Sequence, residues 1–322
     1  MNSFSSLRRS FIWTVILPMG ICLLLVGRLP AGFIIASGQN NGDPTHSTGN
    51  HYYSIDIDTG VATPISPQLS GSSPAGLASS GSQIVGFKDG QHGVVDPYTG
   101  IFSPDGSSNG LSITGYEVLN GSGYGVPVSG GDRRLHRINV STSQATPIGS
   151  GAPIADALDS FFGEAPGTNA PFIIGLGSIG NLIYGVHLGT NRNNLLEIDS
   201  ATGLASVLGV PNAVGLSGNP GNGRYSGFAA MTGVDADGNG VFDALFGAVN
   251  FFDPDASGPL PNQRLGGLAR YDIADGTWTM VGTNPGLIYF GFASTAVPEP
   301  SSGVLLLVAS FGILTKVRRR DQ

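Results

Sequence analysis

A short run of oxygen-bearing side chains, residues 235–243, has the spacing of a calcium-binding loop. The run reads DADGNGVFD, with carboxylate or amide oxygens at its first, third, fifth and ninth positions. Gly240 permits the sharp turn that such a loop needs, and the backbone carbonyl at the seventh position supplies a further oxygen ligand. The pattern predicts a Ca²⁺ site formed by Asp235, Asp237, Asn239, Val241 and Asp243.

The surroundings of this loop distinguish two kinds of calcium site. An EF-hand carries a bidentate Glu at position twelve, where this chain has Phe246, so a helix-loop-helix site is excluded. The loop resembles the calcium loops of integrin-type and VCBS-type repeats, and this resemblance implies a loop that joins two strands of one propeller blade. An Asp- and Gly-rich turn without metal is the alternative.

Other residue types that could perform catalysis are scattered along the chain. We expect the five histidines to lie at the surface or in loops: His46, His51, His92, His136 and His187. Glu197 and Asp199 could serve as the paired carboxylates of a glycosidase, but both fall on one face of a predicted strand. The sequence therefore favours a non-enzymatic protein, with an extracellular polysaccharide lyase or hydrolase as the alternative.

A phrase at residues 53–65, YSIDIDTGVATPI, organises the rest of the chain because weaker versions of it recur. The echoes lie at residues 93–100, 135–149, 195–203 and 269–276. Each has an alternating strand that ends in Asp or Asn, a turn, and in most cases a Gly that permits positive φ, which together predict a β-hairpin. Because the phrase recurs, we interpret it as a turn that holds one repeat to the next.

Each hairpin follows two further segments rich in Gly and small residues, which gives four strands per round. Four strands with a period of 40 or more residues are typical of a propeller blade, whose inner strands are crowded around a central axis. The segment 287–293 supplies an inner strand without a hairpin, and residues 52–66 supply a hairpin without an inner strand. Joining the two closes a ring and removes both free edges.

The predicted fold is therefore an all-β propeller over residues 51–296. We expect five four-stranded blades, or six if irregular spacing hides one, and a β-sandwich with long loops is the alternative architecture. Composition agrees, because only 11% of the residues are charged while Gly numbers 51 and Pro 21. The single cysteine, Cys22, excludes a disulfide framework.

The charge of the central region limits its partners. Residues 38–297 contain 8 Lys and Arg against 20 Asp and Glu, a net charge of −12. This acidity disfavours nucleic acid and anionic membranes as partners of that region and favours cations.

The N-terminal 37 residues have the layout of a secretory signal peptide. Arg8 and Arg9 precede an apolar run from Phe11 to Val26, and small residues follow. We expect a signal helix over residues 1–37 and a polar linker over residues 38–50. An uncleaved membrane anchor and a lipidated Cys22 are the alternatives.

The C-terminal segment 297–322 carries a more specific pattern. Val297, Pro298, Glu299 and Pro300 precede an apolar run from residue 304 to 314, and a basic tail follows. The cations of that tail are Lys316, Arg318, Arg319 and Arg320. In this order the parts closely resemble the PEP-CTERM sorting signal of bacterial surface proteins.

The PEP-CTERM resemblance implies that an exosortase-type protease recognises the Pro-Glu-Pro element. The apolar run would form a short transmembrane helix that holds the chain at the inner membrane during processing. Because the run is short, we expect this anchor to be transient, and an ordinary C-terminal membrane anchor is the alternative. Together the signals predict an exported protein of the cell surface or extracellular matrix that binds a partner such as polysaccharide or has a structural role.

Overall fold

The computed structural model describes the central region of the chain in nine ranges. These are residues 32–40, 48–127, 134–149, 172–188, 193–209, 225–236, 242–253, 263–273 and 276–295. Within these ranges, no helix has the length and apolar character needed to cross a membrane. Most of the predicted signal segment and the whole predicted sorting segment, residues 297–322, lie outside the described residues.

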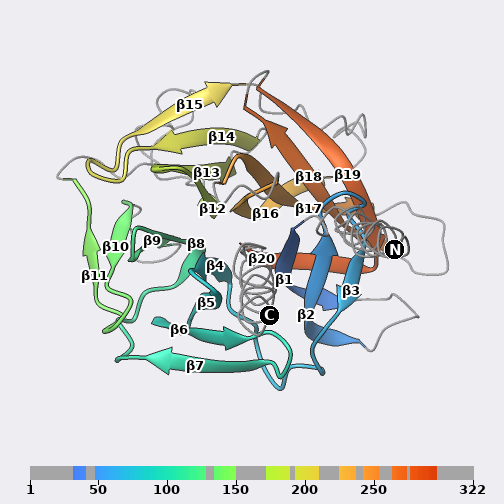
Figure 1. The fold of residues 1–322 in the computed structure, drawn as a ribbon, viewed down its shortest axis with the longest axis horizontal. Helices are drawn as coiled ribbons and strands as arrows, with labels where there is room; N and C mark the ends of the chain where they lie inside the picture. Colours follow the sequence, from blue (N-terminus) through green and yellow to red (C-terminus); the bar gives the residue numbers. More distant parts are fainter. Residues whose placement is uncertain are drawn as a thin grey trace, which may run out of the picture. The chain divides into compact units, whose positions relative to one another are not determined.

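The described strands form five four-stranded antiparallel sheets, which are the blades of a β-propeller (Figure 1). Blade 1 contains, from the axis outward, β20 (Leu287–Ser294), β1 (Phe33–Asn40), β2 (Gly49–Asp56) and β3 (Ala62–Pro64). Blade 2 contains β4 (Gly76–Ser80), β5 (Gln83–Lys88), β6 (Gln91–Asp96) and β7 (Ile101–Asp105). Blade 3 contains β8 (Ile113–Leu119), β9 (Ser122–Pro127), β10 (His136–Ile138) and β11 (Ala145–Pro147).

The remaining two blades complete the ring. Blade 4 contains β12 (Phe172–Ile179), β13 (Leu182–Leu188), β14 (Asn193–Ile198) and β15 (Ala205–Gly209). Blade 5 contains β16 (Tyr225–Val234), β17 (Ala244–Asp253), β18 (Gln263–Asp272) and β19 (Thr277–Pro285). The predicted five-bladed, all-β propeller is confirmed, and the six-bladed and β-sandwich alternatives are not what the described strands form.

Ring closure occurs inside blade 1, where the last strand pairs with the first. In β1, Ile34 lies opposite Ser294 of β20 on one side and opposite Ile55 of β2 on the other. The predicted joining of the C-terminal inner strand to the N-terminal hairpin is therefore confirmed. However, blade 1 also contains β1, which lies between β20 and β2. The sequence pattern did not predict that strand.

The predicted boundary between signal peptide and linker is consequently wrong. The sequence pattern puts residues 33–37 in the signal segment and 38–40 in an unstructured linker, yet all belong to β1. Ile34 and Ala36 are fully buried. A strand buried on both faces is a continuous apolar run, so this part of β1 reads in sequence like the end of a signal's apolar region. The propeller begins at Phe33 rather than residue 51.

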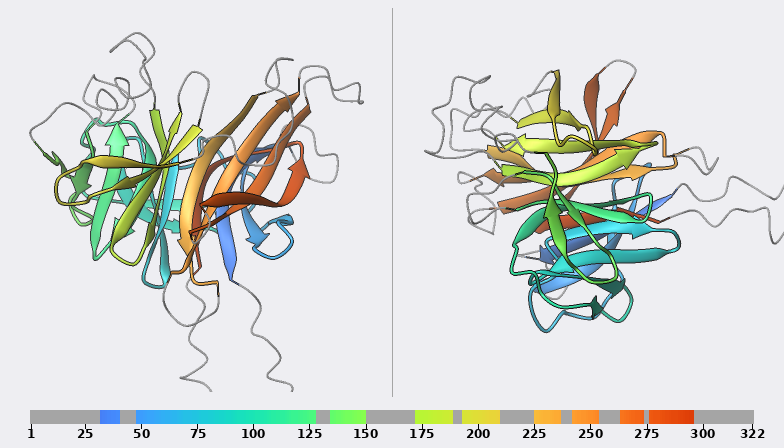
Figure 2. Two further views of the ribbon diagram at one scale, coloured as in Figure 1. Left: turned by 90° about the horizontal axis from the view of Figure 1, so that it is seen from above. Right: turned by 90° about the vertical axis from the view of Figure 1, so that its left-hand side faces the viewer.

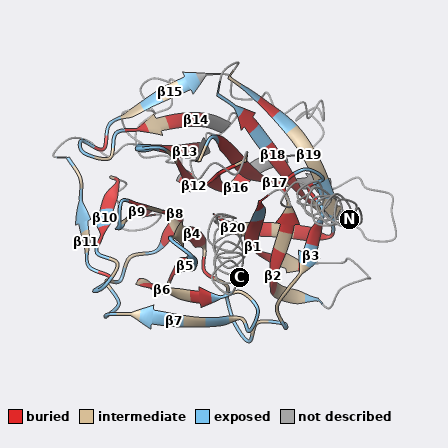
Figure 3. Ribbon diagram, in the orientation of Figure 1, coloured by how far each residue is buried: buried red, intermediate tan, exposed pale blue. Residues whose placement is uncertain are grey.

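The hydrophobic core lies between blades rather than within a single central cluster. The packed clusters each combine two neighbouring blades, as where Leu135 of blade 3 joins Leu196 of blade 4, or Val85 of blade 2 joins Tyr116 of blade 3. Buried residues concentrate on the inner strands, while outer strands such as β7, β11 and β15 are largely exposed (Figure 3). Each blade is therefore stabilised mainly by its two neighbours.

Close packing of the inner strands requires glycine at defined points. A Cβ atom added at Gly177 of β12 would lie 3.0 Å from the Cα of Thr232 on β16. A side chain at Gly233 would meet the carbonyl oxygen of Ser178 in the same way. These contacts agree with the expectation that small residues line the crowded axis.

Replacing Ile34 by Ala tests the assignment of β1. We expect the free energy of unfolding of the purified protein to fall by about 2–5 kcal/mol, since a fully buried isoleucine loses most of its packing, and the melting temperature to fall with it. Phe33→Ala, at a position 37% exposed, is the matched control and should have a smaller effect. Equal melting temperatures for Ile34→Ala and wild type would show that residue 34 is not part of the folded propeller.

Candidate functional site

The repeated phrase forms a turn that is stabilised by its own Asp or Asn side chain. In four blades the Oδ1 atom of this residue accepts hydrogen bonds from the backbone N–H groups two and three residues later. The residues are Asp56, Asp96, Asn139 and Asp199. In Asp199 the hydrogen bonds from the backbone N–H groups of Thr202 and Ala201 lower the carboxyl pKa. These side chains therefore serve the turn, as the recurrence of the phrase predicted.

The last residue of each turn adopts a left-handed backbone conformation. Gly60, Gly100, Gly203 and Gly276 have φ values of 69°, 78°, 72° and 70° at this position. Ser143 takes the position in blade 3 with a φ of 59°, which costs a residue with a side chain more than glycine. Unlike glycine, Ser143 brings a hydroxyl group to this position, and that group is hydrogen-bonded.

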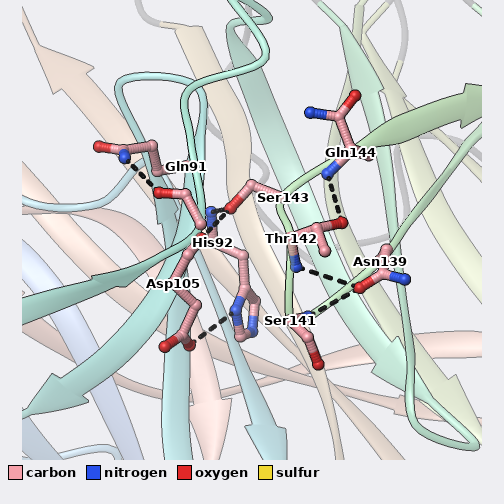
Figure 4. A network of polar contacts seen from close by, with 9 residues as sticks. Gln91, His92, Asp105, Asn139, Ser141, Thr142, Ser143 and Gln144 are labelled. Carbon is pink, nitrogen blue, oxygen red and sulfur yellow. Dashed lines mark hydrogen bonds and ion pairs between the residues drawn. The ribbon is translucent and has the colours of Figure 1, made fainter.

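The Ser143 hydroxyl joins blade 3 to blade 2 (Figure 4). It accepts a hydrogen bond from the backbone N–H of His92 at 3.0 Å and donates to the carbonyl oxygen of Asp105. The side-chain amide of Asn109 donates to the Ser143 carbonyl at 2.6 Å. The turn of blade 3 is thereby held against the outer strands of blade 2.

The closing interface between blade 5 and blade 1 uses an asparagine for the same purpose. Asn284 of β19 donates through Nδ2 to the carbonyl of Gly60 at 2.8 Å and accepts through Oδ1 from the N–H of Ala62 at 3.0 Å. At both interfaces a small polar side chain satisfies backbone groups of the neighbouring blade. The predicted role of the turn in holding blade to blade is confirmed for these interfaces.

Ser143, His92 and Asp105 are the residue types of a hydrolytic triad, but their geometry does not support catalysis. The Ser143 hydroxyl contacts the backbone of the other two residues, whereas a triad serine bonds the imidazole ring. The His92 Nδ1 atom lies 3.2 Å from Asp105 Oδ2. Burial lowers the pKa of His92 more strongly than Asp105 raises it, so the imidazole is neutral near pH 7. The cluster is an inter-blade contact.

The expectation that the histidines lie at the surface is wrong for three of them. His51, His92 and His136 are buried, each at 4% exposure. His46 and the side chain of His187 lie outside what the structure describes. The three buried rings lie on β2, β6 and β10, the third strands of their blades, where they fill space against neighbouring strands.

A set of polar residues lies near the carboxyl ends of the five inner strands. We call it the axial ring, and each blade contributes one member: Ser79, Glu117, Ser178, Thr232 and Ser294. Ser79 Oγ donates to the carbonyl of Ser294, and the Ser294 N–H donates to Thr232 Oγ1 at 3.1 Å. These bonds link blades 2, 1 and 5, and Thr232 lies beside Gly177 of blade 4.

Glu117 is the charged member of this ring. Its Oε1 atom accepts a hydrogen bond from Ser178 Oγ at 3.2 Å, which links blade 3 to blade 4. The side chain is 2% exposed, and burial raises the pKa of its carboxyl to about 8. Its Oε2 atom is buried and has no hydrogen-bond partner. Sequence reasoning missed this residue, although it is the one charged residue in the predicted inner strand 113–119.

The predicted calcium loop connects β16 with β17, the first and second strands of blade 5. Asp235 is buried at one end of the connection, and Asp243 is exposed at the other. The Asp243 Oδ1 atom accepts a hydrogen bond from the Ala236 N–H at 2.9 Å, and its own N–H donates to the carbonyl of Val234 at 3.0 Å. The structure therefore brings the two ends together. Asp237, Asn239 and Val241 lie outside the described residues.

The antiparallel order gives the ring two different faces, seen from the side in Figure 2. The Asp or Asn turns lie at the outer edge of the blades, between the third and fourth strands. The 235–243 connection begins at the face where the inner strands end, because it follows the inner strand β16. The connections between blades begin and end at the opposite face, which we call the connection face. A surface pocket of about 340 Å³ opens there between blades 2 and 3. Its lining includes Ser72, Ser73, Lys88, Asp89 and Leu111.

Comparisons with known proteins identify no family. No family model and no curated protein matches the chain. A nidogen–laminin complex structure is similar at 11% identity and a TM-score of 0.44, covering 82% of this chain and 98% of that one.

Two further solved structures illustrate the range of similar molecules. A puromycin hydrolase mutant complexed with PGG matches at 15% identity and a TM-score of 0.35, covering 80% of this chain and 36% of that one. The computationally designed Ika4 protein matches at 13% identity and a TM-score of 0.29, covering 68% of this chain and 98% of that one. Similarity at these levels concerns the fold and assigns no function.

Substitution of Ser143 tests the contact between blades 2 and 3. Ser143→Ala should lower the free energy of unfolding by about 1–3 kcal/mol, because it leaves buried backbone groups of His92 and Asp105 without a partner. Ser143→Gly loses the same bonds but relieves the left-handed conformation, so it should cost about 1 kcal/mol less than Ser143→Ala. Chemical denaturation measures both, with the exposed Ser141→Ala as the control. A neutral Ser143→Ala would contradict a stabilising role for the hydroxyl.

Proposed function

We propose that this protein is an exported, non-enzymatic binding propeller of the cell surface or extracellular matrix. The observation that supports this most directly is the surface pocket between blades 2 and 3. It opens at the connection face, where the segments that join the blades begin and end. Binding residues are commonly presented by connections held on a rigid scaffold.

The chemistry of the pocket fits a polar ligand such as a sugar unit of a polysaccharide. Ser72 and Ser73 supply hydroxyl groups, Lys88 and Asp89 supply opposite charges, and Leu111 supplies an apolar wall. A volume of about 340 Å³ is at the lower end of the range for small-molecule sites. An extracellular polysaccharide lyase or hydrolase is the second candidate, since propellers also carry enzymes.

The destination of the chain follows, in this proposal, from its two ends. The segment before Phe33 acts as the export signal, and it must end before β1 because Ile34 is needed in the core. The segment 297–322 acts as a PEP-CTERM sorting signal that an exosortase-type protease recognises at Pro298, Glu299 and Pro300. The apolar helix and the basic tail hold the chain in the membrane only during processing.

The loop 235–243 binds Ca²⁺ in the same proposal. Asp235 and Asp243 are held at its two ends by the pairing of β16 with β17, and Asp237, Asn239 and Val241 complete the oxygen set of the sequence pattern. In the oxygen-rich spacing of this loop, Ca²⁺ would offset the repulsion between three nearby carboxylates. Its role would be to stiffen the connection.

Filling the pocket tests its role in binding. Ser72→Trp places a large side chain at the pocket rim and should weaken binding of glycans selected on an array by about tenfold or more, which is about 1.4 kcal/mol. Ser103→Trp, at an exposed position on β7 of the same blade, is the matched control and should bind like wild type. If Ser72→Trp and Ser103→Trp bind these glycans equally well, the binding site lies outside this pocket. Turnover of acidic polysaccharides by the wild-type protein would favour the lyase or hydrolase alternative.

Sorting is tested by a C-terminal epitope tag in a host that contains an exosortase. Wild-type protein should lose the tag as the C-terminal segment is removed, and Glu299→Ala should retain it because the recognised Pro-Glu-Pro element is broken. Ser302→Ala, outside that element, should lose the tag like wild type. Tag loss that is unchanged in Glu299→Ala would exclude this element as the processing signal.

A further inference from the structure

One buried oxygen atom on the propeller axis is not explained by the packing around it. Glu117 Oε1 is bonded to Ser178, but Oε2 is buried without a hydrogen-bond partner. Leaving a buried oxygen without a partner destabilises the fold. Protonation would turn this oxygen into a donor, which again needs a partner.

The axial ring to which this atom belongs carries only oxygen atoms as possible side-chain ligands. Its four other members are hydroxyl-bearing residues, and Ser178 still has free lone pairs after donating its proton to Glu117. Cα atoms of β8 approach those of β16 and β20, on blades that are not its neighbours, within 8 Å. The inner strands therefore lie close together around the axis.

We propose that the axial ring binds a hard metal cation of the Ca²⁺ class, with Glu117 Oε2 as its anionic ligand. Hydroxyl and carboxylate oxygens are the ligand types that such cations prefer, and the absence of ring nitrogen or sulfur among the five members disfavours softer metals. A water molecule could donate one hydrogen bond to Oε2, but it would not stabilise the charged form of the carboxyl, which burial disfavours. A bound cation would coordinate the oxygen, stabilise that charged form and tie blade 3 to the other ligands.

This site is separate from the loop 235–243 because it uses no residue of that loop. It also does not depend on the proposed glycan binding, since the pocket lies at the connection face whereas the ring lies near the carboxyl ends of the inner strands. Loss of one metal site can therefore be measured while the other is retained.

The test counts bound Ca²⁺ in full-length protein purified in detergent and freed of metal by a chelator. Glu117→Gln, which keeps the shape of the side chain, should bind one Ca²⁺ fewer per chain than wild type by calorimetry and equilibrium dialysis. Asp237→Ala should lose only the loop ion, and the double variant both. Glu197→Gln, a half-buried carboxylate on β14, is the matched control and should bind like wild type.

Two outcomes overturn the axial site. The first is an equal Ca²⁺ stoichiometry in Glu117→Gln and wild type, which would contradict the axial site but not the loop site. The second is a complete loss of Ca²⁺ binding in the single variant Asp237→Ala, which would leave no ion for the axial site. If Glu117→Gln does not fold, the axial Ca²⁺ affinity is measured in Ser178→Ala instead. Removal of a hydroxyl that orients the carboxylate should weaken axial Ca²⁺ binding by about 10- to 100-fold, and unchanged affinity there would contradict the proposal.

Discussion

The pairing of β1 with β20 is the interaction on which the rest of the structure depends. It joins strands about 250 residues apart in the chain, from Ile34 opposite Ser294 to Asn40 opposite Leu287. Without it, blade 1 would lack its inner strand, and β1 and β20 would each expose a strand edge that can pair with another chain. Because the blades are stabilised by their neighbours, closure also completes the set of interfaces that holds each sheet in place.

The hydrogen bonds described across those apolar interfaces come mostly from small polar side chains rather than from long charged ones. Ser143 and Asn284 each satisfy backbone groups of a neighbouring blade, and on the axis Ser79 and Thr232 do the same for Ser294. A serine or asparagine loses less conformational entropy on ordering than a long Lys or Arg side chain. The low charge content of the chain is thus consistent with how its blades are joined.

The sequence allowed much of the fold to be predicted because the turn chemistry is local. Asp56 and its counterparts bond their own backbone, so the repeated phrase identifies the blades without tertiary information. The strand β1 was missed because Ile34 and Ile35 are buried in a run that resembles the end of a signal peptide. His92 and Glu117 were missed for a different reason: their burial depends on the neighbouring blade, which no local pattern describes. Both ends of the predicted calcium loop, Asp235 and Asp243, directly follow and precede two paired strands, as the sequence predicted.

The symmetry of the fold sets a limit on what the axis can carry. Five equivalent blades would repeat any axial residue five times, and five carboxylates within a narrow ring would repel one another strongly in a buried environment. One carboxyl among four hydroxyl-bearing residues avoids this repulsion while keeping an all-oxygen ring. The turns show a similar single exception: four blades have glycine at the left-handed position, and only blade 3 has a serine there, Ser143. Functional chemistry in this propeller is therefore expected where one blade differs from the other four, because the repeated positions are already used to hold the ring together.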